Sequence, residues 1–428
     1  MTEKRIVITG IGPLASPGLG KDAFWKGIVN NRTNVTKEEC KVGKKTWESY
    51  FIHKIKNFKI SKQYQQEFNA IKIEKNDNPL DLYYLIMAAK LALEDGALKY
   101  DAEDNDVGLI LTHENLGYNS FAEKAFSFSY KALKGRPNRK LDKINFFKKA
   151  YINCYKSVYD LQTFMHLFYV GKMLKLHGTA FFINNACASG VYALEAGAML
   201  IRSGHCRSVV IAAADKPDVY KYLWFKNSHI YSESGIIKPF AENADGFVLG
   251  DGGAGILVED YDQARRRKAH IYAEYLGGSF KSEGWKVSLP AVGRNFYEQV
   301  ITKCLSNSSV NLKDIDLVVP HGVGNRIVDE YEAAALFKIF KPDKNSPIFT
   351  AFKPFIGHNL GGSTLLETII ALLGVDNNLI PPLLNCKTKN KNIKINFLQE
   401  FVKKRIKYFL KTVTAFAGFD AALLFKKI

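Results

Sequence analysis

A cysteine set among small residues is the first position whose surroundings suggest chemistry. Cys187 lies in the segment Asn184-Asn-Ala-Cys-Ala-Ser-Gly190, between a strand-like apolar run and a stretch with helical spacing. A thiol at the start of a helix meets the positive end of the helix dipole and free backbone N–H groups, which favour the nucleophilic thiolate. The N–H of Cys187 is also placed to stabilise an oxyanion. Taken alone, however, a free cysteine is more often a buried apolar residue, so this site needs partners.

Two histidines supply candidate partners. His321 stands in Val318-Val-Pro-His-Gly-Val-Gly-Asn325, at the end of a buried strand, and His358 stands in a glycine-rich stretch just before a helix. Glycine lets a ligand approach the backbone closely, and functional residues gather in loops at strand ends. A cysteine with two histidines could bind a metal, but a thiolate–imidazole acyl-transfer site fits these loops better. We therefore expect an acyl-transfer site and no metal.

An alternation of strands and helices must position these residues, and it predicts an α/β sandwich with covered sheets. The second half of the chain repeats the order of elements in the first, which suggests an internal duplication split near residue 260. We expect one half at 1–260, carrying the cysteine, and another at 261–428, carrying both histidines. The segment 113–160 fits neither plan and is predicted to be an insertion of helices and loops. The predicted strands are 5–9, 107–111, 181–183, 208–213, 256–259, 271–276, 317–319, 349–350, 412–416 and 421–425, and the predicted helices are 23–30, 80–98, 188–203, 295–306, 329–340 and 364–373.

Composition excludes several classes of protein. The chain has 428 residues, of which 47% are hydrophobic and 24% charged, as in ordinary soluble proteins. No apolar run reaches the roughly 20 residues of a membrane span, and the apolar run that begins at Ile6 is too short for the core of a signal peptide. The six cysteines are scattered without a CxxC pair, so neither a zinc site nor a disulfide framework is indicated. We expect a cytoplasmic protein without a membrane span.

The chain carries a net charge of +18, and its basic residues cluster at 131–149 and 387–411. Such an excess indicates an acidic partner, or else solvated basic faces. Aromatic residues in both stretches would suit single-stranded nucleic acid. No nucleic-acid-binding motif accompanies the charge, so we expect no nucleic-acid partner.

Four segments, taken in order, resemble the β-ketoacyl-[acyl-carrier-protein] synthases, condensing enzymes of the thiolase superfamily. The resemblance covers nearly the whole chain and implies a thiolase-like duplicated five-layered αβαβα sandwich. It also implies chain elongation in fatty-acid synthesis, or the ketosynthase subunit of a type II polyketide or specialised fatty-acid system. The segments are Arg5-Ile-Val-Ile-Thr-Gly-Ile-Gly12, the Ala-Cys-Ala-Ser turn at Cys187, Lys238-Pro-Phe240 with Asp245 to Gly252, and His321-Gly-Val-Gly with Asp329 and Glu332, then Lys353, Ile356-Gly-His358 and Glu367.

The resemblance implies a role for each matching residue. Cys187 takes the acyl chain from a carrier protein, and His321 and His358 support decarboxylation of a malonyl group whose enolate then attacks the acyl carbonyl. Lys353 holds a histidine and tunes the local charge, with Glu367 as its partner. The remaining supporting residues are Asp329 and Glu332, and Phe416, whose backbone N–H completes the oxyanion hole in the family.

The same resemblance implies the partners. Substrates arrive on the phosphopantetheine arm of an acidic acyl carrier protein, and no cofactor is bound. The family is dimeric, so we expect a homodimer or a heterodimer with a homologous chain-length-factor-like subunit. Two alternatives stay open: a non-elongating acyltransferase of the same fold, or the partner subunit of a heterodimeric ketosynthase.

Several positions depart from the family pattern. Val323 and Asn325 replace threonines whose hydroxyls contact the phosphopantetheine arm, so substrate contacts at these positions must differ. Asn185 stands where threonine is common. Ala415 and Ala417 replace glycines in the loop around Phe416, and alanine tolerates a positive φ poorly, which predicts a stiffer or reshaped loop.

Overall fold

The computed structural model describes residues 4–42, 44–56, 58–59, 80–113, 162–341, 343 and 346–428, with isolated positions between 62 and 152. The predicted insertion at 113–160 lies almost entirely outside these residues. So do the basic stretch 131–149 and Cys154. Among the described residues, no helix has both the length and the apolar content to cross a bilayer.

Two sets of five strands repeat the same pairing pattern. In the first set the order is β1 (Ile6–Ala15), β9 (Gly252–Asp260), β7 (Ser208–Asp215), β5 (Gly108–Thr112) and β6 (Ala180–Phe182). In the second the order is β10 (Ala273–Ser282), β16 (Phe419–Lys426), β15 (Tyr408–Ala415), β11 (Leu317–Val319) and β12 (Ile348–Phe349). In each set the first two pairings are antiparallel and the last two parallel. A short antiparallel pairing of Ile6–Ile8 with Ala273–Tyr275 joins the sets.

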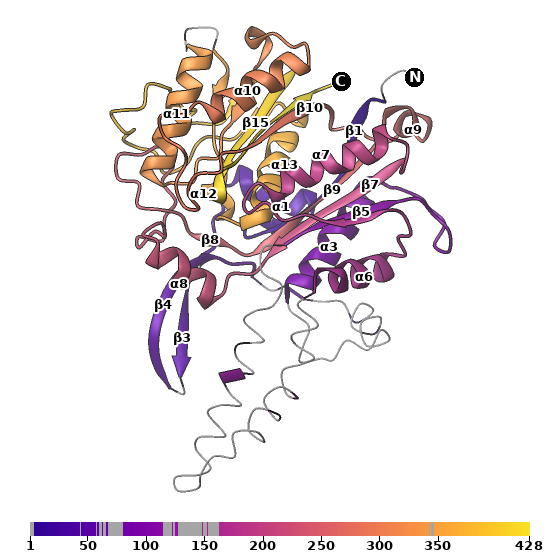
Figure 1. The fold of residues 1–428 in the computed structure, drawn as a ribbon, viewed down its shortest axis with the longest axis horizontal. Coiled ribbons are helices and arrows are strands. Elements are labelled where there is room, and N and C mark those ends of the chain that lie inside the picture. Colours follow the sequence, from indigo (N-terminus) through magenta and orange to yellow (C-terminus); the bar gives the residue numbers. More distant parts are fainter. Residues whose placement is uncertain are drawn as a thin grey trace, which may run out of the picture.

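Helices fill the space between the two sets of strands and cover both outer faces (Figure 1). The central layer holds α7 (Ser189–Arg202) and α13 (Ser363–Asp376). One outer layer contains α3 (Leu80–Asp95) and α6 (Thr163–Leu174), and the other contains α10 (Phe296–Asn307) and α11 (Arg326–Phe340). The α/β sandwich predicted from the sequence is confirmed.

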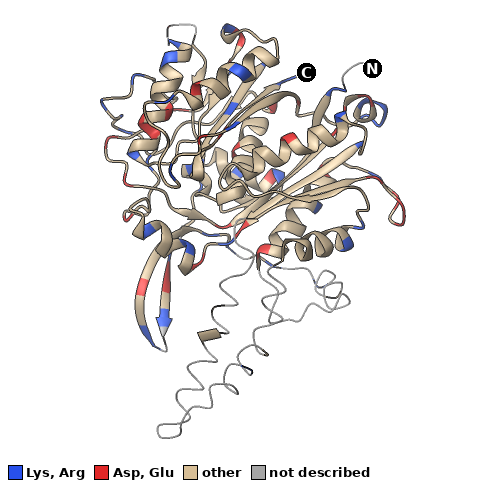
Figure 2. Cartoon of the chain, viewed as in Figure 1, with Lys and Arg blue, Asp and Glu red and all other residues tan. Residues whose placement is uncertain are grey.

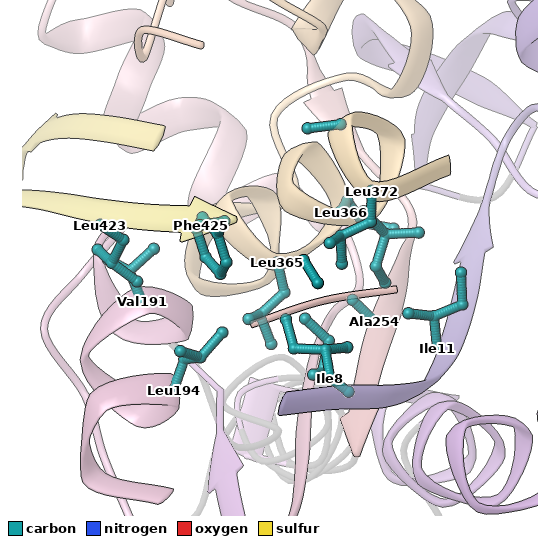
Figure 3. Close-up of a cluster of buried hydrophobic side chains, with 14 of the residues drawn as sticks. Ile8, Ile11, Val191, Leu194, Ala254, Leu365, Leu366, Leu372, Leu423 and Phe425 are labelled. Carbon is teal, nitrogen blue, oxygen red and sulfur yellow. The ribbon is translucent and has the colours of Figure 1, made fainter. Parts of the chain in front are cut away.

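Strand periodicity explains how each set of strands faces two layers. Val209, Ile211 and Ala213 of β7 pack with the central helices, whereas Val210, Ala212 and Ala214 pack with α3 and α6, since alternate side chains point to opposite faces. Figure 3 shows the central core, where leucines of α13 lie between strands β1 and β9 on one side and β16 on the other. The helix α13 is buried on all sides from Ser363 to Val375, which explains its apolar run.

The structure corrects several predicted boundaries. The first strand extends to Ala15, well past the predicted end at Thr9, and the glycine-rich stretch before Ile256 already belongs to strand β9. The division near residue 260 stays a prediction; it falls between β9 and β10.

Other elements were not predicted. A hairpin of β3 (Val35–Val42) and β4 (Lys45–His53) projects from the body, and β4 pairs with β8 (Leu249–Gly250). Helix α8 (Val219–Asn227) lies beside it. By contrast, α1 (Lys21–Val29) confirms the helix predicted at 23–30. The remaining elements are β2 (Gly18–Leu19), α9 (Tyr261–Arg266), α12 (Lys353–Ile356), β13 (Leu379–Ile380), β14 (Val402–Lys403) and three short 3₁₀ turns at Leu312–Asp314, Leu360–Gly362 and Phe416–Gly418.

Candidate active site

A sharp turn between β6 and α7 presents Cys187. Ala186 adopts a left-handed φ of 49°, a conformation that costs a non-glycine residue about 1 kcal/mol or more. Ser189 holds the turn, because its hydroxyl accepts a hydrogen bond from the N–H of Asn185 at 2.8 Å and donates to the carbonyl of Ala186 at 2.5 Å. Cys187 therefore lies two residues before Ser189, the first residue of α7, and its side chain is buried.

Two buried carboxylates of α11 fix the loop that carries His321. The Glu332 carboxylate accepts the N–H groups of His321 and Gly322, each at 2.8 Å. The Asp329 carboxylate accepts those of Val323 and Gly324 at 3.1 and 3.2 Å. These contacts satisfy the backbone of the loop, so His321 is held where β11 ends.

His358 is held between α12 and α13. Gly357 before it has a φ of 76°, and a side chain there would collide with Gly250. The Nδ1 atom of His358 lies 2.8 Å from the Ser363 hydroxyl at the start of α13. The ring is thereby oriented with Nε2 available on the opposite side.

The structure brings Cys187, His321 and His358 together. One ligand-type atom from each residue lies within 4.8 Å of the others, and all three side chains are buried. The two imidazole rings have centroids 5.6 Å apart and are nearly perpendicular. Such a trio could also bind zinc. Two buried lysines near it, Lys353 and Lys411, would however repel a divalent cation.

A buried charge network lies behind His321. The Lys353 ammonium lies 3.0 Å from Nδ1 of His321, donates to the His321 carbonyl at 2.6 Å, and pairs with Glu367. The other oxygen of Glu367 lies 2.5 Å from the ammonium of Lys411. These three charged side chains are all 0% exposed.

The sequence reasoning missed Lys411. The sequence places Lys411 in the basic stretch 387–411, which is expected at the surface; for Lys411 this expectation is wrong, because the residue is buried in β15. A single lysine within the apolar run Tyr408–Ala415 was the available signal. Buried lysines are rare unless they are paired.

Both histidines are neutral near pH 7. Burial lowers the pKa of His321 well below its ordinary value near 6.5, and the positive charges of Lys353 and Lys411 lower it further. The same causes, burial first, lower the pKa of His358. Since an ammonium has no acceptor atom, Nδ1 of His321 must accept from Lys353. The ring proton of His321 therefore resides on Nε2.

Comparisons with known proteins assign this constellation to a family. A model described as "Beta-ketoacyl synthase, N-terminal domain" matches residues 3–264, and one described as "Beta-ketoacyl synthase, C-terminal domain" matches residues 272–387. The chain belongs to the β-ketoacyl synthase family.

Relatives of this synthase include a nodulation protein, a 3-oxoacyl-[acyl-carrier-protein] synthase and a subunit of a polyketide synthase. Nodulation protein E of a Rhizobium species is 24% identical over the full length of both chains, and 3-oxoacyl-[acyl-carrier-protein] synthase 2 of Vibrio harveyi is 23% identical, also over the full length. The ketoacyl synthase alpha subunit of the tetracenomycin polyketide synthase of Streptomyces glaucescens is 30% identical over 56% of this chain and 58% of its own.

Solved structures share the fold of this synthase. The ishigamide ketosynthase/chain length factor superposes with a TM-score of 0.83 at 20% identity over all of both chains. A type II polyketide ketosynthase in complex with its acyl carrier protein superposes with a TM-score of 0.80 at 20% identity, again over all of both chains. These matches confirm the thiolase-like duplicated sandwich.

A cavity leads from the protein surface to the two histidines of the synthase. Val323 and Asn325, predicted to contact substrate, both line it. Asn325 also caps α11 by accepting the N–H groups of Ile327 and Val328 at 3.1 and 3.3 Å; its amide nitrogen is thus the group left to donate toward a ligand. The cavity is lined by Ile230, Phe247, Ser288, Leu289, Pro290, His321, Val323, Asn325, Val328, His358, Thr414, Ala415 and Phe416.

The loop around Phe416 closes one side of this cavity. The Phe416 ring packs edge-on against Trp224 and Phe225, with centroids 5.4 and 5.8 Å apart. Ala417 has a φ of 60°, so the alanine that replaces glycine does adopt the disfavoured conformation. The N–H of Ala417 donates to the carbonyl of Val287 at 2.7 Å, and the Gly418 carbonyl accepts from Glu283 at 2.8 Å. These bonds tie the loop to the neighbouring segment at 283–287.

Asp420 follows this loop and is fully buried. Burial raises the pKa of Asp420 from 3.8 to about 8, and the negative charge of the neighbouring Glu283 contributes to this rise. Between about pH 4 and pH 8 the folded state therefore binds a proton that the unfolded state lacks. By linkage, this group makes the synthase less stable as pH rises through that window.

Replacing Asp420 by Asn is expected to remove this loss of stability. Because one pKa unit corresponds to about 1.4 kcal/mol, we expect Asp420→Asn to raise the free energy of unfolding by about 1–3 kcal/mol at pH 8.5 and by much less at pH 5. Urea unfolding at both values checks this, with Asp104→Asn, at an exposed acid, as the control. Equal effects at both pH values would show that Asp420 is already ionised in the folded state at pH 5.

Proposed function

We propose that this chain catalyses the decarboxylative Claisen condensation of an acyl thioester held on Cys187 with malonyl-acyl carrier protein, giving a β-ketoacyl-acyl carrier protein. The convergence of Cys187 with His321 and His358, two histidines that line a cavity, carries this proposal. A nucleophile with two neutral imidazoles beside it can both accept an acyl group and stabilise an enolate.

The first half of the reaction loads the acyl chain. The Cys187 thiolate attacks the carbonyl carbon of an acyl thioester, the carbon–sulfur bond to the carrier breaks, and the phosphopantetheine thiolate leaves and takes up a proton. Negative charge develops on the carbonyl oxygen during this step. The backbone N–H groups of Cys187 and Phe416 are the donors that we assign to this oxyanion.

The second half forms the carbon–carbon bond. Malonyl thioester occupies the cavity, its carboxylate leaves as CO₂, and the electron pair of the broken bond forms an enolate. His321 donates through Nε2–H to the enolate oxygen, and His358 provides the second donor. The enolate carbon attacks the acyl carbonyl on Cys187, the new C–C bond forms, and the Cys187 thiolate is expelled.

Supporting roles follow from the contacts. Lys353 keeps the proton of His321 on Nε2, and Glu367 balances the charge of Lys353. Asp329 and Glu332 hold the loop of His321 in place.

Two residues that line the cavity, Val323 and Asn325, would contact the phosphopantetheine arm that carries the substrate. Val323 offers only an apolar contact to a phosphopantetheine arm. Asn325 can donate from its amide nitrogen.

Charge supports an acidic acyl carrier protein as the partner. The chain has a net charge of +18, and Figure 2 shows Lys and Arg on many of the described helices and loops. A structural neighbour is a ketosynthase in complex with its acyl carrier protein. We expect docking to weaken as ionic strength rises, and we propose a cytoplasmic location, since a reducing compartment keeps Cys187 as a free thiol.

We propose that the chain forms a dimer, which is either a homodimer or a heterodimer. The chain retains Cys187 and both histidines, which favours a catalytic subunit. A neighbouring structure is a ketosynthase/chain length factor, so a heterodimer with such a homologous subunit is the second candidate, beside a homodimer.

The proposed function is tested by incubating the protein with hexanoyl- and malonyl-acyl carrier protein and measuring intact masses. We expect a hexanoyl adduct on the enzyme, and then a carrier protein whose mass corresponds to a 3-oxo-octanoyl group. The product must depend on malonyl carrier protein and be accompanied by CO₂ release. An adduct without any condensation product, over a series of acyl lengths, would instead indicate the non-elongating acyltransferase.

A further inference from the structure

Lys411 is a buried charge that the proposed chemistry leaves without a role. It lies on β15 and is fully buried beneath the active site. Its ammonium lies 2.5 Å from one oxygen of Glu367 and donates to the Pro320 and Thr412 carbonyls at 3.2 and 3.0 Å. A buried cation is costly unless its surroundings compensate it, so these contacts are the reason the residue is tolerated.

The contacts of Lys411 converge on His321. Pro320, whose carbonyl accepts from Lys411, directly precedes His321 in the chain. Glu367 bridges Lys411 to Lys353, and Lys353 in turn contacts both Nδ1 and the carbonyl of His321. The network therefore contacts both the backbone and the ring of His321.

The charges of this network do not cancel. One carboxylate, Glu367, lies between two ammonium groups, Lys353 and Lys411. All three side chains are buried, so water does not screen their charges. If Lys411 were absent, Glu367 and Lys353 would form a neutral pair. Lys411 thus adds one positive charge on the side of the site where the proposed reaction builds up negative charge.

We propose that Lys411 is a positioning residue for condensation: through Glu367 and the strand-end carbonyls it holds Lys353 on Nδ1 of His321, so that Nε2–H of this ring points to the reacting groups. This inference rests on the proposed function. Lys411 touches no reacting atom. It acts through Lys353 and His321, and it extends the charge pair of Lys353 and Glu367 into a three-membered network.

The charged and titratable groups facing His321 come from several elements. They are Lys353 on α12, Glu367 on α13, Lys411 on β15, Glu332 on α11, and the nearby His358 and Cys187. Lys411 lowers the pKa of both histidines, after the larger effects of burial and Lys353. Removing its charge should therefore make both imidazoles easier to protonate.

The test compares Lys411→Met with Val413→Ala, a change at a buried position two residues along the same strand and hence on the same face. Condensation and Cys187 acylation are measured from pH 5 to pH 8.5. For Lys411→Met we expect the acid limb of the condensation profile to move up by about one pH unit, so that the rate at low pH falls about tenfold and recovers toward pH 8. Relative to wild type, the rate of Cys187 acylation at pH 8 should fall less than the rate of condensation at pH 6. For Val413→Ala we expect no movement of the acid limb.

A second measurement does not depend on turnover. NMR titration of the ring carbons of ¹³C-labelled histidine, assigned with His321→Gln, should show a higher pKa for His321 in Lys411→Met than in wild type. Unchanged histidine titrations together with an unmoved acid limb would overturn the inference, whatever the loss of rate. A shifted titration in a protein that never condenses malonyl groups would overturn the proposed function and leave the positioning of His321 by Lys411 standing.

Discussion

Cys187→Ala is expected to abolish both the acyl adduct and condensation, with a loss of turnover on the order of 10³-fold or more. Among the described residues, Cys187 is the cysteine that clusters with His321 and His358, so we expect no other described cysteine to replace it. Intact-mass analysis after incubation with acyl carrier protein measures the adduct, and the yield of β-ketoacyl carrier protein measures turnover.

Cys304 offers a matched control for this variant. It is likewise a buried free cysteine, but it lies on α10, and burial raises the pKa of its thiol to about 12. Cys304→Ala should therefore acylate like wild type. If Cys187→Ala became acylated as readily as wild type, the assignment of the nucleophile would be wrong.

His321→Ala is expected to separate the two half-reactions. Acylation needs the Cys187 thiolate and backbone donors, whereas decarboxylation needs the Nε2–H of His321 at the enolate oxygen. Loss of one such donor typically costs 10²- to 10³-fold, so we expect condensation to fall by about that factor while the acyl adduct still forms within about tenfold of the wild-type rate. His358→Ala should show the same separation.

Single-turnover measurements check this prediction, with the acyl adduct and the release of CO₂ followed separately. His270→Ala, at an exposed histidine that pairs with Asp376 at the surface, is the control and should leave both steps unchanged. Equal losses of acylation and condensation in His321→Ala would point instead to a general base for Cys187, and hence to an acyltransferase mechanism.

The sequence by itself determined which side chains to expect at the candidate active site. The small residues around Cys187 and the glycines beside His321 and His358 are local features, because a sharp turn or a close approach of backbone to ligand needs those residue types at those positions. Periodicity predicted the helix at 80–98 for an equally local reason. It failed for the hairpin β3–β4, whose mixed charged and apolar residues carry no clear period and whose pairing with β8 is a long-range contact.

Only the tertiary structure decided how the reacting groups are tuned. Lys411 read as part of a basic surface, and it became a buried partner of Glu367 because β15 passes between the outer helices and α13. Likewise Asp420 gained its raised pKa from burial and from Glu283, a residue on a distant segment. A side chain's pKa depends on which distant charges and apolar surfaces surround it, and strand order, which no local pattern encodes, determines those neighbours. The sequence could therefore name Cys187 and its histidines, whereas the charge network that keeps those histidines neutral emerged only from the fold.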